Sequence, residues 1–446
     1  MSRKCFNLET HGQYEYAMQI IELNNLLFNR STEDMDRIIN NSNVEHLDGR
    51  ELEIYQTYVH EMTHFIDSTT TLWGMEYTTR MYRWFNEKSS KYLKVFAIND
   101  VEITMHNKLH EELFSDGLNF REIKFSLDHC DLVGIYVQFH YLSEYGSPII
   151  STPLTIFSLF EGHAYAQEKL VSCKIFEKNG DLVSLAILER SINEQISQLK
   201  SSEYTCLLAL VIQLFPNIKL SRKLEIICIL SKFCFNAPTI LLSTFPNDLM
   251  RMIFHGANEE LISSLQMELS RGTNRSILAL LLLLAMKIKT EEDNTSLDEL
   301  TSDQIEPLLL NVYVTRSQSI DDVVARMKVF WEIEFDLLTS ICEEVGAELA
   351  LKMANQVKNM SWYNINLKDI YLPDVYLKNG DWLSSKRPLD FDIPNHYEEM
   401  IEESMSLEAS LNAYGVTREH LTPSFYHGWL KHMKTENTGI YIHTEE

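Results

Sequence analysis

The chain has 446 residues, 45% of them hydrophobic, and 39 Lys and Arg against 64 Asp and Glu give it a net charge of −25. This hydrophobic content supplies a sizeable core and argues against wholesale disorder. The negative charge argues against a nucleic-acid partner and against binding to anionic membranes, because both need a basic face. It leaves open a preference for basic substrate segments.

The sequence predicts a cytoplasmic protein. Its N-terminus lacks the apolar core of a signal peptide. The longest purely apolar run, Ile277–Met286, is far shorter than the ~18–20 residues that a membrane span needs. The seven cysteines are odd in number and show no CxxC spacing, which is typical of reduced thiols.

Helical periodicity dominates, and Gly (15) and Pro (10) are scarce. In chain order, helices are predicted over Tyr14–Phe28, Arg50–Thr70, Met75–Tyr92, Pro153–Cys173, Leu182–Leu199, Leu220–Phe235, Ser276–Ile288 and Ile320–Val357. Strands are predicted over Lys94–Ile98, Leu132–Phe139, Asp369–Leu377 and Gly439–His443. An acidic linker is expected over Lys289–Asp303, and Asn366–Pro394 is expected to be irregular with short strands.

These elements predict an α+β fold that is mainly α-helical. Three consecutive regions are expected. Residues 1–180 form a first region, for which the motif described next predicts a catalytic role, 181–290 form a helical accessory region, and 291–446 form a C-terminal helical and mixed region.

One short motif carries chemistry: His60-Glu61-Met62-Thr63-His64. On a helix, residues i and i+4 share a face, so His60 and His64 can present two imidazoles to one metal ion. Glu61 lies about 100° around the helix and can reach a water instead of the metal. A metal ion acidifies water while a carboxylate takes its proton, which makes a nucleophile at neutral pH. The uncharged residues on both sides of the motif favour a buried helix.

A third ligand is expected from a later helix, and Glu161 is the best candidate. Pro153 suits a first helical position, with Ser151 or Thr152 as the cap. The apolar turns that follow lead directly into Glu161, and a carboxylate there is costly unless it is paired or bound to metal.

The HExxH segment resembles the signature of the zincin metallopeptidases, and a glutamate on a second helix resembles the gluzincin division. The resemblance covers about residues 50–170. The metzincin pattern is excluded because Asp67 and Thr70 stand where it has Gly and His. The resemblance implies Zn²⁺ held by His60, His64 and Glu161, and an active-site helix that packs on a small sheet.

Gluzincins often have Asp four residues after the third ligand, where it orients a zinc-bound histidine. Tyr165 stands there in this chain, so Tyr165 and Asp67 are the candidates for hydrogen bonds to the ligands. Glu168 is the next candidate for the third ligand after Glu161. His163 is expected to be a packed or exposed histidine. The remaining rivals are Glu76, Glu102, His106, His110 and His140.

The resemblance predicts an intracellular zinc-dependent metallopeptidase with Glu61 as general base. Candidates for the donor to the oxyanion are Ser424–Trp429 and His140–Tyr141. Expected partners are a protein or peptide substrate and a regulatory protein, with no nucleic acid and no membrane. The alternatives left open are a non-catalytic zinc-binding interaction protein and a zinc hydrolase of a non-peptide amide or ester.

Overall fold

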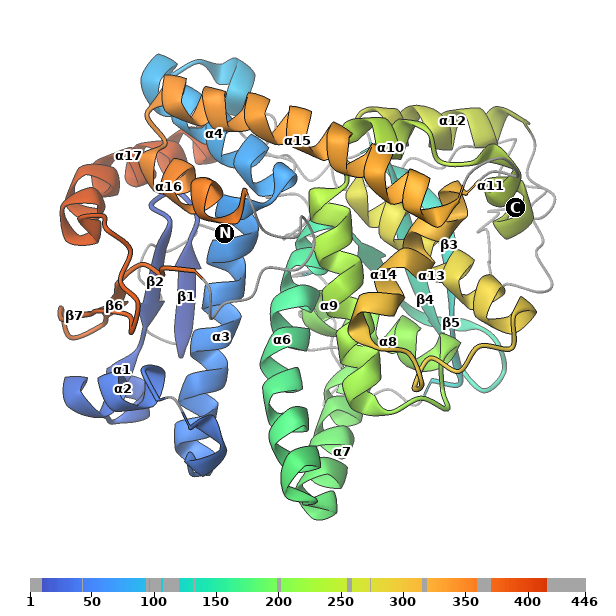
Figure 1. Ribbon diagram of the computed structural model, residues 1–446, viewed down its shortest axis with the longest axis horizontal. Helices are drawn as coiled ribbons and strands as arrows, with labels where there is room; N and C mark the ends of the chain where they lie inside the picture. Colours follow the sequence, from blue (N-terminus) through green and yellow to red (C-terminus); the bar gives the residue numbers. More distant parts are fainter. Residues whose placement is uncertain are drawn as a thin grey trace. The chain divides into compact units, whose positions relative to one another are not determined.

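The computed structural model describes residues 10–41, 43–93, 96, 106, 120–130, 134–198, 202–254, 259–272, 274–314, 319–358 and 370–414. Within these ranges the fold is α+β and mainly helical, with two small sheets (Figure 1). The predicted fold class is therefore confirmed. No helix of the described residues is long and apolar enough to cross a membrane.

The contacts between elements group the chain into two compact units. The first contains residues 1–97, 167–182 and 333–415, and the second contains residues 98–166, 183–332 and 416–446. The assignment of catalytic and accessory roles to regions 1–180, 181–290 and 291–446 stays a prediction.

The first unit has a four-stranded sheet in the order β1-β2-β6-β7. β1 (Gly12–Glu15) and β2 (Ile20–Leu23) form an antiparallel hairpin. β2 pairs in parallel with β6 (Val375–Leu377), which pairs antiparallel with β7 (Trp382–Leu383). β1 therefore lies at an edge of this sheet.

The helix predicted over Tyr14–Phe28 is wrong, because only its last turn is helical, as α1 (Asn25–Phe28). All four residues of β2 are buried, so the strand shows no alternation of apolar and polar residues. A short apolar run of this kind cannot be told from a buried helix by periodicity.

The long helix α3 (Gly49–Thr70) packs on β1 and β2 and on α2 (Thr32–Ile39). It begins with a capping box, in which Asp48 and Glu51 accept hydrogen bonds from each other's backbone N–H groups. Every residue from Tyr58 to Thr70 is buried. The predicted helix Arg50–Thr70 is confirmed.

The chain turns sharply after α3. Thr71 is extended, with φ −100° and ψ 156°, and caps α4 (Leu72–Glu87). Gly74 permits this turn, because a Cβ atom there would lie 2.1 Å from the carbonyl oxygen of Asp67. The helix predicted over Met75–Tyr92 corresponds to α4 and to the 3-10 turn Ser90–Tyr92.

The predicted helix Ile320–Val357 is two helices, α15 (Ile320–Val345) and α16 (Glu348–Val357). Gly346 separates them with a positive φ of 78°. α16 packs on α3, and α17 (Ile393–Tyr414) also belongs to the first unit. Residues 370–394 are irregular with short strands, as expected. Of the described residues in the strand predicted over Asp369–Leu377, only the last three form a strand, β6.

The second unit has an antiparallel sheet in the order β3-β4-β5. The strands are β3 (Glu122–Cys130), β4 (Gly134–Leu142) and β5 (Pro148–Leu154). The strand predicted over Leu132–Phe139 corresponds to part of β4. The strand predicted over Gly439–His443 lies outside the described residues, as does that over Lys94–Ile98 apart from Phe96, which is helical.

α6 (Ile156–Asn179) follows β5 directly. The expected start at Pro153 is wrong, because Pro153 pairs with Gln138 in the edge strand β5, where a missing N–H is tolerated. The cap is Thr155, whose hydroxyl accepts from the N–H of Ser158 at 3.1 Å, while the hydroxyl of Ser158 accepts from the N–H of Thr155 at 2.7 Å.

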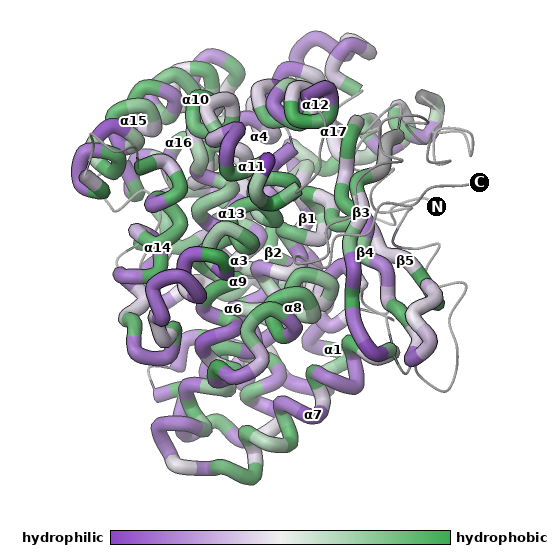
Figure 2. Tube along the Cα trace, turned by 90° about the vertical axis from the view of Figure 1, so that its right-hand side faces the viewer, coloured by the Kyte–Doolittle hydropathy of each residue, from purple (hydrophilic) through white to green (hydrophobic). Residues whose placement is uncertain are grey.

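The other helices of this unit surround a buried centre. Residues Ile277–Met286 of α13 (Arg275–Glu292) are all buried, and Figure 2 shows hydrophobic stretches along α8 and α13. α13 extends three residues past Lys289, into the expected linker. The remaining helices are α7 (Leu182–Gln198), α8 (Ser202–Leu214), α9 (Leu220–Asn236), α10 (Thr239–Ser243), α11 (Asn247–Ile253), α12 (Glu259–Ser270) and α14 (Ser302–Leu310).

Candidate metal site

The two motif histidines face each other on α3. The Nε2 atom of His60 lies 3.2 Å from the Nε2 atom of His64, and both side chains are buried. Two imidazoles that bind one zinc ion at 2.0–2.1 Å with a tetrahedral angle have nitrogens about 3.3 Å apart. The observed separation fits a metal ion that both rings bind through Nε2.

Glu161 on α6 completes the group. One ligand atom from each of His60, His64 and Glu161 lies within 4.8 Å of the others, and all three residues are buried. This group could hold a metal ion. Among the described residues, His60, His64 and Glu161 are the group of three or more His, Cys, Asp or Glu side chains whose ligand atoms lie this close together.

The orientation of α6 follows from contacts within the first unit. The side-chain amide of Gln56 on α3 donates to the carbonyl oxygen of Glu168 at 3.3 Å and to the hydroxyl of Ser172 at 2.7 Å. These bonds direct the Glu168 face of α6 toward α3. Glu161 precedes Glu168 by seven residues on the same uninterrupted helix, which is about two turns, so both carboxylates lie on this face.

Glu168 contacts His60 on the side of the ring away from His64. Its Oε2 lies 3.2 Å from Nδ1 of His60, and its Oε1 lies 2.6 Å from Nζ of Lys169. Burial raises the pKa of Glu168, but the hydrogen bond with His60 and the charge of Lys169 outweigh burial and lower the pKa to about 2. An ionised carboxylate only accepts hydrogen bonds, so Nδ1 of His60 is the donor in this contact, and in a neutral imidazole Nε2 is then the nitrogen with a lone pair for a metal ion.

Glu61 is buried on α3, next to Gly12 of the edge strand β1. A Cβ atom on Gly12 would lie 2.9 Å from Oε1 of Glu61 and 2.6 Å from Cγ2 of Thr57. The absence of a side chain at Gly12 therefore lets a strand edge reach the carboxylate.

Two tyrosines of the β1–β2 hairpin surround His64. The ring of Tyr14 stacks on His64 at a centroid distance of 6.4 Å, and the Tyr14 hydroxyl forms a 2.6 Å hydrogen bond with the Ser68 hydroxyl. Burial raises the pKa of Tyr14 well above its usual value. Tyr16 is half-buried, and its ring centroid lies 6.1 Å from that of His64. Neither tyrosine could be predicted from the sequence, because each meets His64 across about 50 positions of the chain.

Tyr165 and Asp67, which were expected to form hydrogen bonds to the metal ligands, are both buried. Tyr165 is buried and donates to the side-chain oxygen of Gln195. Asp67 is buried on α3, three residues after His64. Their roles beside the ligands stay predictions. His163 is fully buried with its ring 6.3 Å from that of Phe235, in keeping with a packed histidine.

The rival ligands lie elsewhere or outside the described residues. Glu76 pairs with Arg80 along α4. His106 lies 3.0 Å from the hydroxyl of Ser202. Both ring nitrogens of His140 lie 2.7 Å from serine hydroxyls, those of Ser126 and Ser151, within the second sheet. Glu102, His110 and residues 424–429 lie outside the described residues.

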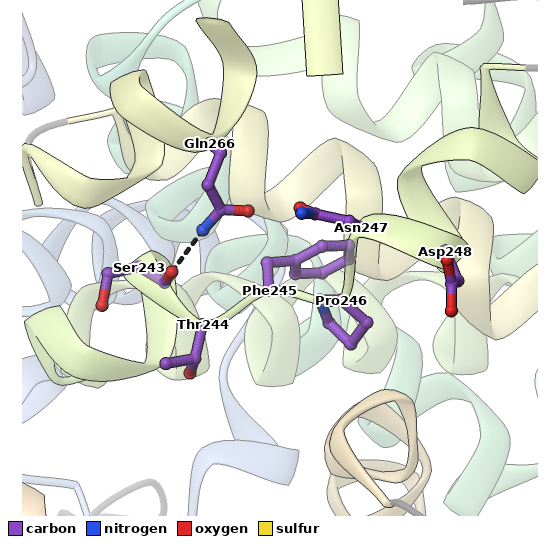
Figure 3. Close-up of a pocket in the computed structure, with 7 residues that line it drawn as sticks. All are labelled: Ser243, Thr244, Phe245, Pro246, Asn247, Asp248 and Gln266. Atoms are coloured by element: carbon purple, nitrogen blue, oxygen red, sulfur yellow. Dashed lines mark hydrogen bonds between the residues drawn. The ribbon is translucent and has the colours of Figure 1, made fainter. Parts of the chain in front are cut away.

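A surface pocket in the second unit carries no comparable chemistry. It is lined by Ser243, Thr244, Phe245, Pro246, Asn247, Asp248 and Gln266 (Figure 3). The amide of Gln266 donates to the carbonyl oxygen of Ser243 there. Its single ionisable side chain, Asp248, is 98% exposed. None of the side chains that line this pocket is therefore both buried and ionisable.

No protein-family model, curated protein or solved structure matches this chain.

Proposed function

We propose that the protein is a zinc-dependent metallopeptidase. The single observation that carries this proposal is the buried group of His60, His64 and Glu161 on two helices, with Glu61 beside it on α3. Two imidazoles and one carboxylate are ligands that zinc prefers, and three protein ligands leave a position open, as in catalytic sites. A zinc ion bound there supplies the Lewis acidity that makes water a nucleophile at neutral pH.

Glu61 is the general base in this proposal. Because it follows His60 by one residue, its carboxylate projects about 100° away from the ligand face, in a direction that suits contact with a water molecule rather than with the metal. Glu61 takes the proton of the attacking water and passes it to the leaving nitrogen of the substrate. Glu61 is therefore ionised again at the end of each catalytic cycle.

The strand edge beside Glu61 favours a peptide over a small ester. β1 is an edge strand of its sheet in the described part of the chain, and Gly12 brings its backbone against the carboxylate. An extended peptide adds to such an edge through main-chain hydrogen bonds, which align its carbonyl groups along the strand.

Tyr16 is the proposed donor to the oxyanion that forms when water attacks the carbonyl. It lies on the hairpin beside His64, with its ring centroid 6.1 Å from that of the histidine, and it is half-buried. Donors aimed at the developing charge in a shielded site account for about 10²–10³ in rate.

Metal analysis and profiling of protein termini test the proposal together. The purified protein should contain one zinc ion per chain, and cells with the wild type should show new termini that are absent with Glu61→Gln. Glu53→Gln, an exposed position two turns earlier on α3, is the matched control and should cleave like the wild type. The proposal fails if zinc is absent, or if Glu61→Gln leaves the cleavage unchanged. Stoichiometric zinc without any cleavage would instead indicate a non-catalytic zinc-binding protein.

A further inference from the structure

The imidazole of His60 is held from both sides. Nε2 faces His64 at 3.2 Å, and Nδ1 faces Oε2 of Glu168 at 3.2 Å. A metal-binding histidine needs its ligand nitrogen unprotonated, and a carboxylate at the other nitrogen fixes this tautomer and the ring orientation.

Glu168 is itself anchored at its carboxylate by Lys169 and at its backbone by Gln56. Lys169 lies 2.6 Å from Oε1, which leaves Oε2 directed at His60. The Gln56 amide bonds the carbonyl oxygen of Glu168 and the hydroxyl of Ser172, so the backbone of α6 is fixed against α3 at this turn. The Glu168 side chain is 18% exposed and that of Lys169 is 17% exposed, so water competes only weakly with either contact.

We propose that Glu168 is the positioning residue of His60, and that Lys169 acts through it by holding its carboxylate in place. This inference rests on the proposed zinc site. Glu168 stands seven residues after Glu161, so it supports the ligand histidine from two turns along the same helix face that supplies the third ligand. Tyr165, four residues after Glu161, is bonded to Gln195.

The first test measures zinc affinity by competition with a chromogenic chelator. Glu168→Ala should still bind one zinc ion, but about 10–100-fold more weakly, which is the usual effect of losing such a partner. Glu168→Gln keeps an oxygen that accepts from Nδ1–H of His60, so it should recover part of the loss. Lys169→Met keeps the length of the side chain and should weaken binding by less than Glu168→Ala. Glu177→Ala, an exposed position on the same helix, should match the wild type.

The second test needs no metal and no substrate. In zinc-free protein with ¹⁵N-labelled histidine, the signal of His60, assigned by its loss in His60→Gln, should report a proton on Nδ1. In Glu168→Ala it should shift toward the form with the proton on Nε2. A carboxylate that only stabilised the packing of α6 would leave this signal in place.

The outcomes separate this inference from the proposed function. A wild type that binds no zinc overturns both. A wild type that binds zinc with the same affinity as Glu168→Ala overturns the positioning role alone, and so does an unchanged tautomer of His60. If Glu168→Ala fails to fold, Glu168→Gln and Lys169→Met decide the question, because both preserve the size of the side chain.

Discussion

Gly12 of β1 lies so close to Glu61 of α3 that a methyl group on the glycine would sit 2.9 Å from the glutamate's Oε1. The same methyl group would lie 2.6 Å from Cγ2 of Thr57, which has less freedom to move than the end of the Glu61 side chain. The strand and the carboxylate are thus fitted to each other at the place where a substrate peptide and the general base would meet.

Gly12→Ala should therefore lower peptidase activity, because the added methyl group displaces Glu61 or moves β1 away from it. A displacement of about 1 Å in a catalytic group lowers the rate by roughly 100-fold. The measurement is kcat on a peptide substrate, with zinc content as a check that the ligands remain in place. Gly49→Ala, where nothing lies within 4 Å of the new carbon, is the matched control and should keep full activity. Full activity in Gly12→Ala would show that the close approach of Gly12 to Glu61 does not determine the position of the carboxylate.

Glu161→Gln should remove most of the zinc. The amide is a much weaker ligand than the carboxylate, so affinity should fall by more than about 100-fold, beyond the range expected for a residue that only supports a ligand. Equilibrium dialysis against buffered zinc measures this loss, with Glu177→Gln on the exposed side of α6 as control. Unchanged zinc binding in Glu161→Gln would show that another side chain is the third ligand.

Tyr16→Phe should lower kcat by about 10²–10³ with little change in KM, because the hydroxyl acts on the charge that develops in the transition state. Tyr14→Phe is the matched control on the same hairpin. It should lose about 1 kcal/mol of stability, through the lost hydrogen bond with Ser68, and keep its kcat. Steady-state kinetics on both variants decide the role, and equal kcat values for Tyr16→Phe and wild type would exclude Tyr16 as the donor.

Glu306 of α14 should make stability depend on pH. It is buried, neither carboxylate oxygen has a hydrogen-bond partner among the described residues, and burial together with the charge of Asp303 raises its pKa to about 9. Below about pH 4.5 the folded and unfolded chains both hold the proton, so its contribution is fully present. As the pH rises toward 9, only the unfolded chain releases the proton, and the free energy of unfolding falls.

Between pH 4.5 and pH 7 this loss amounts to about 3 kcal/mol. Glu306→Gln removes the titration, so its stability relative to wild type should rise by about this amount over the same interval. Urea unfolding at both pH values measures the difference. Glu299→Gln, at an exposed position, should show no such change. A constant difference between Glu306→Gln and wild type would show that Glu306 is ionised in the folded protein.

The sequence predicted the parts of the site that depend on spacing within one helix. His60 and His64 share a face of any helix at four-residue spacing, and the apolar turns around Glu161 marked it as a buried carboxylate. It could not separate the roles of Glu161 and Glu168. Residues seven apart lie on the same helix face, so only the position of α3 decides which one joins the group with His60 and His64 and which one meets Nδ1 of His60.

The sheet of the first unit was beyond sequence reasoning for a different reason. The run Ile20–Leu23 is buried on every side, so its pattern fits a helix as well as a strand. Its parallel partner β6 lies at the far end of the chain, and pairing over such a separation leaves no local signal. Tyr16 was missed for the same reason, since its contact with His64 depends on this sheet.

The pairing of β2 with β6 also sets an order of events during synthesis. The backbone N–H of Lys378 donates to the carbonyl oxygen of Leu23, and its side chain pairs with Glu22, 356 positions earlier. At ~5–20 residues per second, a ribosome needs roughly 20–70 s to pass from one partner to the other. For most of that interval the nascent chain already contains His60, Glu61 and His64, but the sheet on which their helix packs is still unfinished. Completion of the site is thus delayed until most of the polypeptide has been made.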